Sequence, residues 1–490
     1  MSQTVTKNKY ETTIGLEIHV ELLTNSKMFC SCKVEFGGEE NTRVCPVCLG
    51  MPGSLPVANK KAIEYTIKAG LALDCDIASF TQFHRKNYFY PDMPKDYQIS
   101  QFDKPFCSDG HLDVDTEGRH REIRINRVHL EEDTGKMLHQ SKTGRIADAS
   151  YSLVDFNRAG TPLMEIVTEP DIETPGEARA FMQKLRRLVL SLGVSDCNME
   201  EGSMRCDANV SLRIKGEKEL GVKTEVKNMN SFRALQRALE YEVLRQEKLL
   251  NEGERVLQET RHWDADKNIT TTLRSKEEAH DYRYFTDPDL VPMEIPDEWI
   301  EEIRNTLPEL PNARKERFIS EYELSDYDAG LLSATQVIGD YFESVLKIFN
   351  KPKTVANWIM GDLSMHLNAE GKEMEESPIK PKSLAGLLEL IDKGTISGKM
   401  AKDIFQEMYE TGGDADTIVK EKGISQISDE SSLQAIIEEV IEANESSIED
   451  FKSGKQQVVG FLVGQVMKAT KGQANPQVVN KLLKEALAKH

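Results

Sequence analysis

The chain has 490 residues, of which 39% are hydrophobic and 29% charged, with a formal net charge of −20. This length exceeds one hydrophobic core, so we expect two to four domains. No apolar run approaches the roughly 18 residues that a membrane-spanning helix needs, and residues 1–7 resemble neither a signal peptide nor a transit peptide. These features argue against a membrane protein and predict a cytoplasmic one, in which eight cysteines favour metal binding over disulfides.

Residues 14–21 alternate between apolar and polar side chains, which is typical of a half-buried strand. The polar positions are Glu17, His19 and Glu21. Successive side chains of a strand point to opposite faces, so this pattern places two carboxylates and an imidazole on one face. Such a face can hold a divalent cation.

A set of four cysteines follows in the spacing C-x-C-x12-C-x2-C. Each short pair can sit on a tight turn, and the loop between the pairs can bring four thiolates into a tetrahedron. We therefore predict a structural Zn²⁺ site in an insert at residues 28–50, with Cys30, Cys32, Cys45 and Cys48 as its ligands. The other cysteines lack this spacing and are expected to be small core residues: Cys75, Cys107, Cys197 and Cys206.

Residues 1–293 combine short alternating runs with a few helices. Strands are expected at 122–130, with one slip in the alternation as at a bulge, and at 209–214. Thr174-Pro175-Gly176-Glu177 predicts a capped helix start, and a second helix is expected at about 231–250. The region is predicted to be α+β with a largely antiparallel sheet.

The remaining chain is expected to be helical. Residues 287–296 are rich in proline and predict an extended linker or an edge strand. Helical spacing of apolar residues covers 294–406, and shorter helices follow in 407–490, the last beginning at Asn475-Pro476. Residues 407–450 carry thirteen acids and two lysines, a net charge of −11, whereas 451–490 carry seven lysines and one acid, a net of +6. The basic end can bind a polyanion, but a solvated lysine-rich helix face explains it equally well.

Acidic residues recur in four clusters of the first region. If one sheet gathers them, they form a pocket of oxygen ligands that suits Mg²⁺ or Mn²⁺ and supports phosphoryl transfer. No P-loop is present in the sequence, so ATP would need other phosphate ligands, for which 84–92 offers the richest mixture. The clusters are 17–21, 129–133, Glu165, and Glu200 and Glu201 with Arg205 and Asp207.

Several long stretches resemble the B subunit of tRNA-dependent amidotransferases, the GatB family, over essentially the whole chain. They are residues 14–19, 85–92, 97–101, 131–136, 155–163, 205–209, 281–285 and 471–476. The resemblance implies ATP-dependent phosphorylation of the side-chain carboxylate of Glu-tRNA(Gln) or Asp-tRNA(Asn), followed by displacement of phosphate by ammonia. It also implies a glutamine-synthetase-like fold for 1–293 and a YqeY-like, tRNA-binding tail at 407–490.

The resemblance further implies roles for individual residues and partners. Lys86 matches a residue beside the ammonia route, Glu17 lies near the metals, and Glu200, Glu201 and Arg205 belong to the nucleotide site. The chain has no amidase signature, so a glutaminase A subunit and a small C subunit are implied as partners in a heterotrimer. The Mg²⁺ ligands correspond to His19, Glu132, Glu165 and Asp207.

Three other hypotheses remain open at this point. The chain could be a non-catalytic scaffold that only holds tRNA, or a free-standing ligase that uses ammonium directly. It could also resemble the archaeal E subunit, although the sequence leaves no room for that family's inserted domain. The natural charged tRNA is not determined by the sequence.

Overall fold

The computed structural model describes residues 9–116, 118–141, 149–275, 282–423, 430–444, 457–470, 474 and 476–487. The chain divides into two compact units, Met1–Leu310 and Pro311–His490, and each is described by itself. In the described part of the chain, no helix is both long enough and apolar enough to cross a bilayer.

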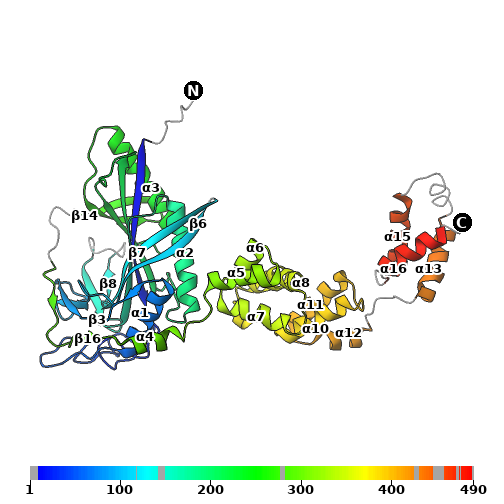
Figure 1. The fold of residues 1–490 in the computed structure, drawn as a ribbon, viewed down its shortest axis with the longest axis horizontal. Helices are drawn as coiled ribbons and strands as arrows, with labels where there is room; N and C mark the ends of the chain where they lie inside the picture. Colours follow the sequence, from blue (N-terminus) through cyan, green and yellow to red (C-terminus); the bar gives the residue numbers. More distant parts are fainter. Residues whose placement is uncertain are drawn as a thin grey trace. The chain divides into compact units, whose positions relative to one another are not determined.

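A nine-stranded sheet forms the centre of the first unit (Figure 1). Among the described strands β12 and β13 run parallel, whereas the other neighbours are antiparallel, which confirms the expected antiparallel-rich sheet. In spatial order the strands are β14 (Ile269–Ser275), β13 (Glu259–Asp264), β12 (Thr224–Lys227), β11 (Met204–Ile214), β1 (Tyr10–Glu21), β10 (Pro162–Thr168), β7 (Arg119–Glu132), β6 (Cys107–Thr116) and β2 (Asp76–Ile77).

The expected slip in the alternation of β7 is present as a register shift. Val167 on β10 lies opposite Arg127 and Thr168 lies opposite Ile125, so Asn126 is an extra residue on β7. Ile123 and Ile125 therefore share the buried side of the strand with Val128 and Leu130 despite the odd spacing.

In the described part of the first unit, four helices pack: α1 (Lys60–Ala72), α2 (Pro175–Ser191), α3 (Phe232–Asn251) and α4 (Asp297–Arg304). The predicted helix starts are confirmed, because Thr174 and Glu177 form a capping box on α2 and Ser231 caps α3. The apolar sides of these helices share one core with the apolar sides of β1, β7, β10 and β11. Leu244, which fits the helical spacing of α3, is exposed.

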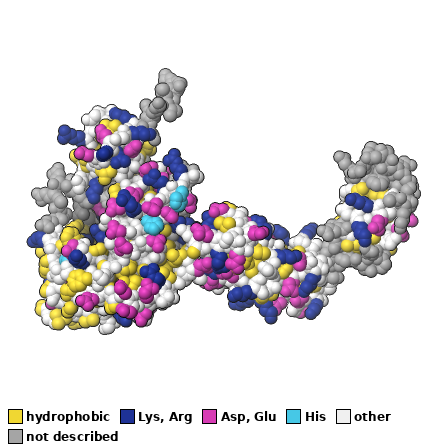
Figure 2. Space-filling model, viewed as in Figure 1, with side chains coloured by type: hydrophobic (Ala, Val, Ile, Leu, Met, Phe, Trp, Pro, Cys, Tyr) yellow, Lys and Arg dark blue, Asp and Glu magenta, His cyan; other side chains and the backbone are white. Residues whose placement is uncertain are grey.

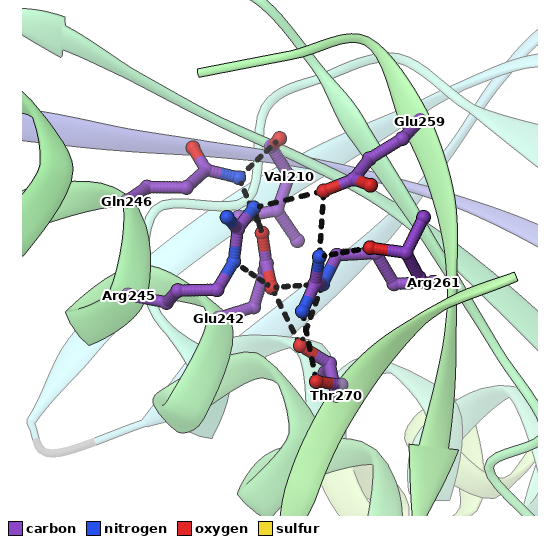
Figure 3. A network of polar contacts seen from close by, with 8 residues as sticks. Val210, Glu242, Arg245, Gln246, Glu259, Arg261 and Thr270 are labelled. Atoms are coloured by element: carbon purple, nitrogen blue, oxygen red, sulfur yellow. Dashed lines mark hydrogen bonds and ion pairs between the residues drawn. The ribbon is translucent and has the colours of Figure 1, made fainter. Parts of the chain in front are cut away.

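A buried polar network joins α3 to β13 and β14 (Figure 3). The Glu242 carboxylate, fully buried, accepts hydrogen bonds from Arg245, Gln246 and Thr270 and lies 3.5 Å from Nε of Arg261. Glu259 pairs with Arg261 at 2.6 Å. Each carboxylate is thus matched by a guanidinium, as burial of charge requires.

The proline-rich stretch belongs to the first unit as edge structure rather than as a linker. β16 (Met293–Glu294) pairs with β3 (Phe80–Thr81), and Leu290 and Ile295 are buried in the first core. The described residues of the unit form two further small sheets. One contains β15 (Phe285–Thr286), β4 (His84–Asn87) and β5 (Tyr97–Ser100), and the other contains β8 (Lys136–Gln140) and β9 (Tyr151–Asp155).

The sequence-based boundary after residue 293 precedes α4, which the structure places in the first unit. Ile300 and Ile303 of α4 are buried in the first core, and the contact division lies after Leu310. The apolar contacts of α4, not the prolines before it, decide where the first unit ends.

The second unit is helical and contains two separate cores. The first core is formed by α5 (Pro311–Tyr322), α6 (Asp326–Leu332), α7 (Gln336–Leu346), α8 (Pro352–Trp358), η2 (Ile359–Leu363), α9 (Ser364–Glu370), η3 (Met374–Glu376), α10 (Pro381–Asp392), α11 (Gly398–Thr411) and α12 (Ala415–Lys422). The second is formed by α13 (Glu430–Glu442), α15 (Gln457–Ala469) and α16 (Pro476–Leu487).

The expected boundary between residues 406 and 407 falls inside α11. Met408 and Tyr409, on the C-terminal part of this helix, are buried in the same core as Ile418 and Val419 of α12. We therefore place the proposed start of the tail after α12. The last helix begins at Pro476 as predicted, whereas its expected cap, Asn475, lies outside the described residues.

Candidate active site on the polar face of the sheet

Strand β1 carries the alternation that the sequence predicts. Ile14, Leu16, Ile18 and Val20 are buried against the helices, and the intervening residues point to the opposite, polar face of the sheet. Because β1 lies between β10 and β11, His19 has Glu165 directly opposite on one side and Arg205 on the other. Pairing of distant strands thus places predicted site residues side by side.

His19, Glu131 and Glu165 converge on this face. One ligand atom from each lies within 4.8 Å of the other two. His19 Nε2 is 3.6 Å from Glu165 and 3.9 Å from Glu131, and His129 Nε2 is 3.3 Å from Glu165. Three strands, β1, β7 and β10, therefore contribute one nitrogen and two carboxylates to a single point.

The electrostatics of this cluster keep Glu165 ionised. Burial opposes its charge, but His129, His19 and Lys86 outweigh burial and lower the pKa of Glu165 well below its ordinary value. The pKa of Lys86, on β4, shifts in the opposite direction. Burial disfavours its charge, yet the carboxylates of Glu131 and Glu165 raise its pKa above the ordinary value.

Glu132 lies elsewhere. Its carboxylate pairs with Lys95 Nζ and accepts a hydrogen bond from the backbone N–H of Ile99 at 2.9 Å. Neighbouring residues of a strand face opposite sides, so Glu131 and Glu132 cannot both reach His19 from β7. The structure brings Glu131 to the cluster, and the alternation of His129 and Glu131 with Val128 and Leu130 is the sequence signal that identifies it.

Glu17 and Asp207 lie opposite each other one row along the sheet from His19. Glu17 accepts a hydrogen bond from Asn209 Nδ2 at 3.0 Å, and Asp207 pairs with Lys227 of β12. Lys227 is a cation on this face that sequence reasoning did not single out. Burial opposes its charge, but Asp207 and Glu225 raise its pKa.

Arg205 forms a second ion cluster next to His19. Its guanidinium donates to Asp133 at 2.6 Å, and Arg158 Nε lies 3.6 Å from the same carboxylate. Burial and the neighbouring Asp133 raise the pKa of Glu21 to about 8. Glu200 and Glu201 are exposed in the turn before β11, where their backbone N–H groups donate to Asn198 Oδ1 at 3.0 and 3.2 Å.

Comparison with known proteins decides the family. Residues 12–301 match the GatB/GatE catalytic domain, and residues 340–487 match the GatB domain that is named with YqeY. The chain belongs to the GatB family. Its relatives include the B subunit of the aspartyl/glutamyl-tRNA(Asn/Gln) amidotransferase of Carboxydothermus hydrogenoformans, 57% identical over 98% of this chain and 99% of the relative. The proteins of the same name from Thermoanaerobacter pseudethanolicus and Persephonella marina are 56% and 53% identical, each over 98% of this chain and 100% of the relative.

This GatB-family chain also gathers the four cysteines of the predicted insert. One sulfur from each of Cys30, Cys32, Cys45 and Cys48 lies within 4.8 Å of the others. Four sulfurs so grouped fit a tetrahedral Zn²⁺ ion. The other four cysteines are buried in the first core, as expected.

A buried lysine accompanies the cysteine set. Lys27 is 1% exposed, and its Nζ lies 3.6 Å from Cys48 Sγ and donates to the Phe156 carbonyl at 3.2 Å. The pKa of the Cys48 thiol is lowered to about 4, mainly by a hydrogen bond from Cys30 and further by Lys27. A lowered pKa favours the thiolate, which is the form that binds metal.

Proposed function

We propose that the chain is the B subunit of a tRNA-dependent amidotransferase and activates the side-chain carboxylate of Glu-tRNA(Gln), Asp-tRNA(Asn), or both. ATP phosphorylates the carboxylate, and ammonia then displaces phosphate to give the amide. The observation that carries this proposal is the convergence of His19, Glu131 and Glu165 on one face of the sheet. The names of the relatives support it independently.

The donor set fits a hard or borderline divalent cation. It offers two carboxylates and an imidazole and no thiol, which suits Mg²⁺ or Mn²⁺. His129 lies beside this donor set, with its Nε2 3.3 Å from Glu165. When bound, Mg²⁺ would neutralise charge on the phosphoryl group being transferred.

The chain's own residues supply the other requirements of the reaction. The charged Lys86 lies among the acidic groups of the cluster and can offset the negative charge of a bound phosphate or carboxylate. Lys227 and Arg205 provide further cations on the same face, and each is held in place by an aspartate. We further propose the roles that the resemblance implies for five other acidic residues: Glu132, Asp207, Glu17, Glu200 and Glu201.

The wider assembly is part of the same proposal. Ammonia would come from a glutaminase A subunit, with a small C subunit completing a heterotrimer, and the complex would be cytoplasmic. The first unit would have the glutamine-synthetase-like fold with a zinc-binding insert at 28–50, and the tail would bind tRNA. The separate helical core of the tail and its seven sequence lysines in 451–490 support the last assignment.

Glu165→Gln tests the proposed function. The variant keeps the shape of the side chain but removes the charge that holds His129 and His19. Loss of hydrogen-bonding groups around a metal ligand costs about 10–100-fold, so loss of the ligand itself should reduce ATP-dependent amide formation at least as much. The assay uses the chain with purified A and C subunits, glutamine and both charged tRNAs, which also identifies the natural substrate.

Glu240→Gln, at an exposed position on α3, is the matched control and should leave amide formation unchanged. A scaffold without catalysis predicts that Glu165→Gln forms amide at the normal rate while tRNA binding is unchanged, and this result would overturn the proposal. The isolated chain given ammonium, ATP and Glu-tRNA(Gln) shows whether the partners are required.

A further inference from the structure

The hairpin of β6 and β7 carries a second cluster of metal-ligating side chains. One ligand atom from each of His111, Asp113 and Glu122 lies within 4.8 Å of the other two. These residues lie on one side of the hairpin, and the buried Leu112 and Ile123 lie on the other. Figure 2 shows histidine and acidic side chains exposed over the part of the first unit where Figure 1 labels β6.

His120 is a second imidazole beside this cluster, next to Asp113. Its Nε2 lies 3.6 Å from Asp113 Oδ1, and its Nδ1 lies 2.9 Å from Asp115 Oδ1. A carboxylate on one ring nitrogen fixes the ring and leaves the other nitrogen available, which is the arrangement that supports histidine ligands in metal sites. Asp115 thus orients His120 toward Asp113.

Strand pairing creates a charge conflict at the centre of the cluster. Asp113 lies directly opposite Glu122, and like charges in that relation destabilise a sheet. Two residues along β7 from Glu122, the guanidinium of Arg124 makes two hydrogen bonds of 2.8 and 2.9 Å to Asp171 and offsets the charge of Glu122 only in part. A bound cation would remove the repulsion between the two carboxylates.

We propose that His111, Asp113, His120 and Glu122 form a surface binding site for a divalent transition-metal ion of the Zn²⁺ class. Two imidazole nitrogens and two carboxylate oxygens can complete four-coordinate Zn²⁺. The ion would link β6 to β7 by binding the opposed carboxylates of Asp113 and Glu122.

The site is distinct from both sites described above. Glu122 and Glu131 are nine residues apart on β7, which corresponds to roughly 30 Å along an extended strand. Its ligands also differ from the all-sulfur cysteine set. The inference therefore goes beyond the proposed function and can fail while that function stands.

Cobalt titration of the full chain, with Zn²⁺ first loaded at the cysteines, tests the proposal. We expect two further Co²⁺ per chain at micromolar concentration, one at the His19 cluster and one at the hairpin, each with visible absorption of nitrogen and oxygen ligation and without thiolate-to-cobalt charge transfer. Glu122→Gln and His120→Gln should each weaken Co²⁺ binding at the hairpin by at least about 10-fold, and Asp115→Asn should weaken it by about 10-fold.

Two controls locate the ion. Asp109→Asn removes one exposed carboxylate from the same strand and should leave the affinity unchanged. Glu165→Gln should lose only the ion of the His19 cluster and retain the ion at the hairpin. Absence of an ion at the hairpin, millimolar affinity only, charge transfer from thiolate, equal binding by Glu122→Gln and the unchanged chain, or loss of both ions in Glu165→Gln would each overturn the proposal. Amide formation by Glu122→Gln should be normal, which separates this test from that of the proposed function.

Discussion

At the scale of single residues, the direction of a side chain from its strand decides its chemistry. Glu131 and Glu132 are neighbours with the same functional group, yet one lies 3.9 Å from His19 and the other pairs with Lys95. The resemblance implies Glu132 as a metal ligand, whereas the geometry favours Glu131.

Metal affinity separates these two residues. We expect Glu131→Gln to weaken Mn²⁺ binding at the His19 cluster by at least about 10-fold, because a ligand is lost. Glu132→Gln should keep that affinity while still reducing amide formation, as the resemblance implies. Titration calorimetry of the full chain measures the Mn²⁺ affinity of both variants. A loss of affinity in Glu132→Gln alone would favour the assignment from resemblance.

Lys27 connects the cysteine set to the segment that follows β9, through Cys48 and the Phe156 carbonyl. We expect purified chain to contain close to one Zn²⁺ at the cysteines, and Lys27→Met to release it about 10–100-fold faster to a chelator. The reason is that four thiolates with Zn²⁺ carry a net negative charge, which the buried ammonium offsets. Lys33→Met, at an exposed lysine next to Cys32, is the control, and zinc analysis after chelation provides the measurement.

At the scale of elements, buried charge joins α3 to the sheet. Glu242 is the shared acceptor of Arg245, Gln246 and Thr270 (Figure 3). Removing one member of such a network leaves buried cations without a partner, so Glu242→Ala should destabilise the first unit by about 3–5 kcal/mol. Urea unfolding followed by tryptophan fluorescence detects the change, because Trp263 is buried on β13. Glu240→Ala, exposed on the same helix, should change stability by less than about 0.5 kcal/mol.

At the scale of the whole molecule, separate cores allow the tail to be removed cleanly. Among the residues that the structure describes, the core of α13, α15 and α16 shares no buried residue with the core that includes α12. Truncation after Gly423 should therefore leave the first unit and α5–α12 folded while weakening tRNA binding, because the lysines of 451–490 are lost. Filter binding at two salt concentrations checks this. Equal binding by the truncated chain would mean that the basic tail is only a solvated helix face.

Local patterns by themselves determined much of the fold. A period of two identified β1 and β7, the capping box at Thr174 identified the start of α2, and the spacing of the four cysteines identified a set that does come together. These features depend on residues close in sequence, whose geometry the backbone dictates.

Only the tertiary structure decided which distant residues meet. The order β11-β1-β10-β7 brings His19 beside Glu165 and Glu131, although more than a hundred residues separate His19 from either. The same pairing engages Arg205 with Asp133 and Asp207 with Lys227, and the packing of α4 extends the first unit to Leu310. The physical reason is that strand order and helix docking follow from burial of a shared apolar core, which depends on all the strands at once and on no single segment.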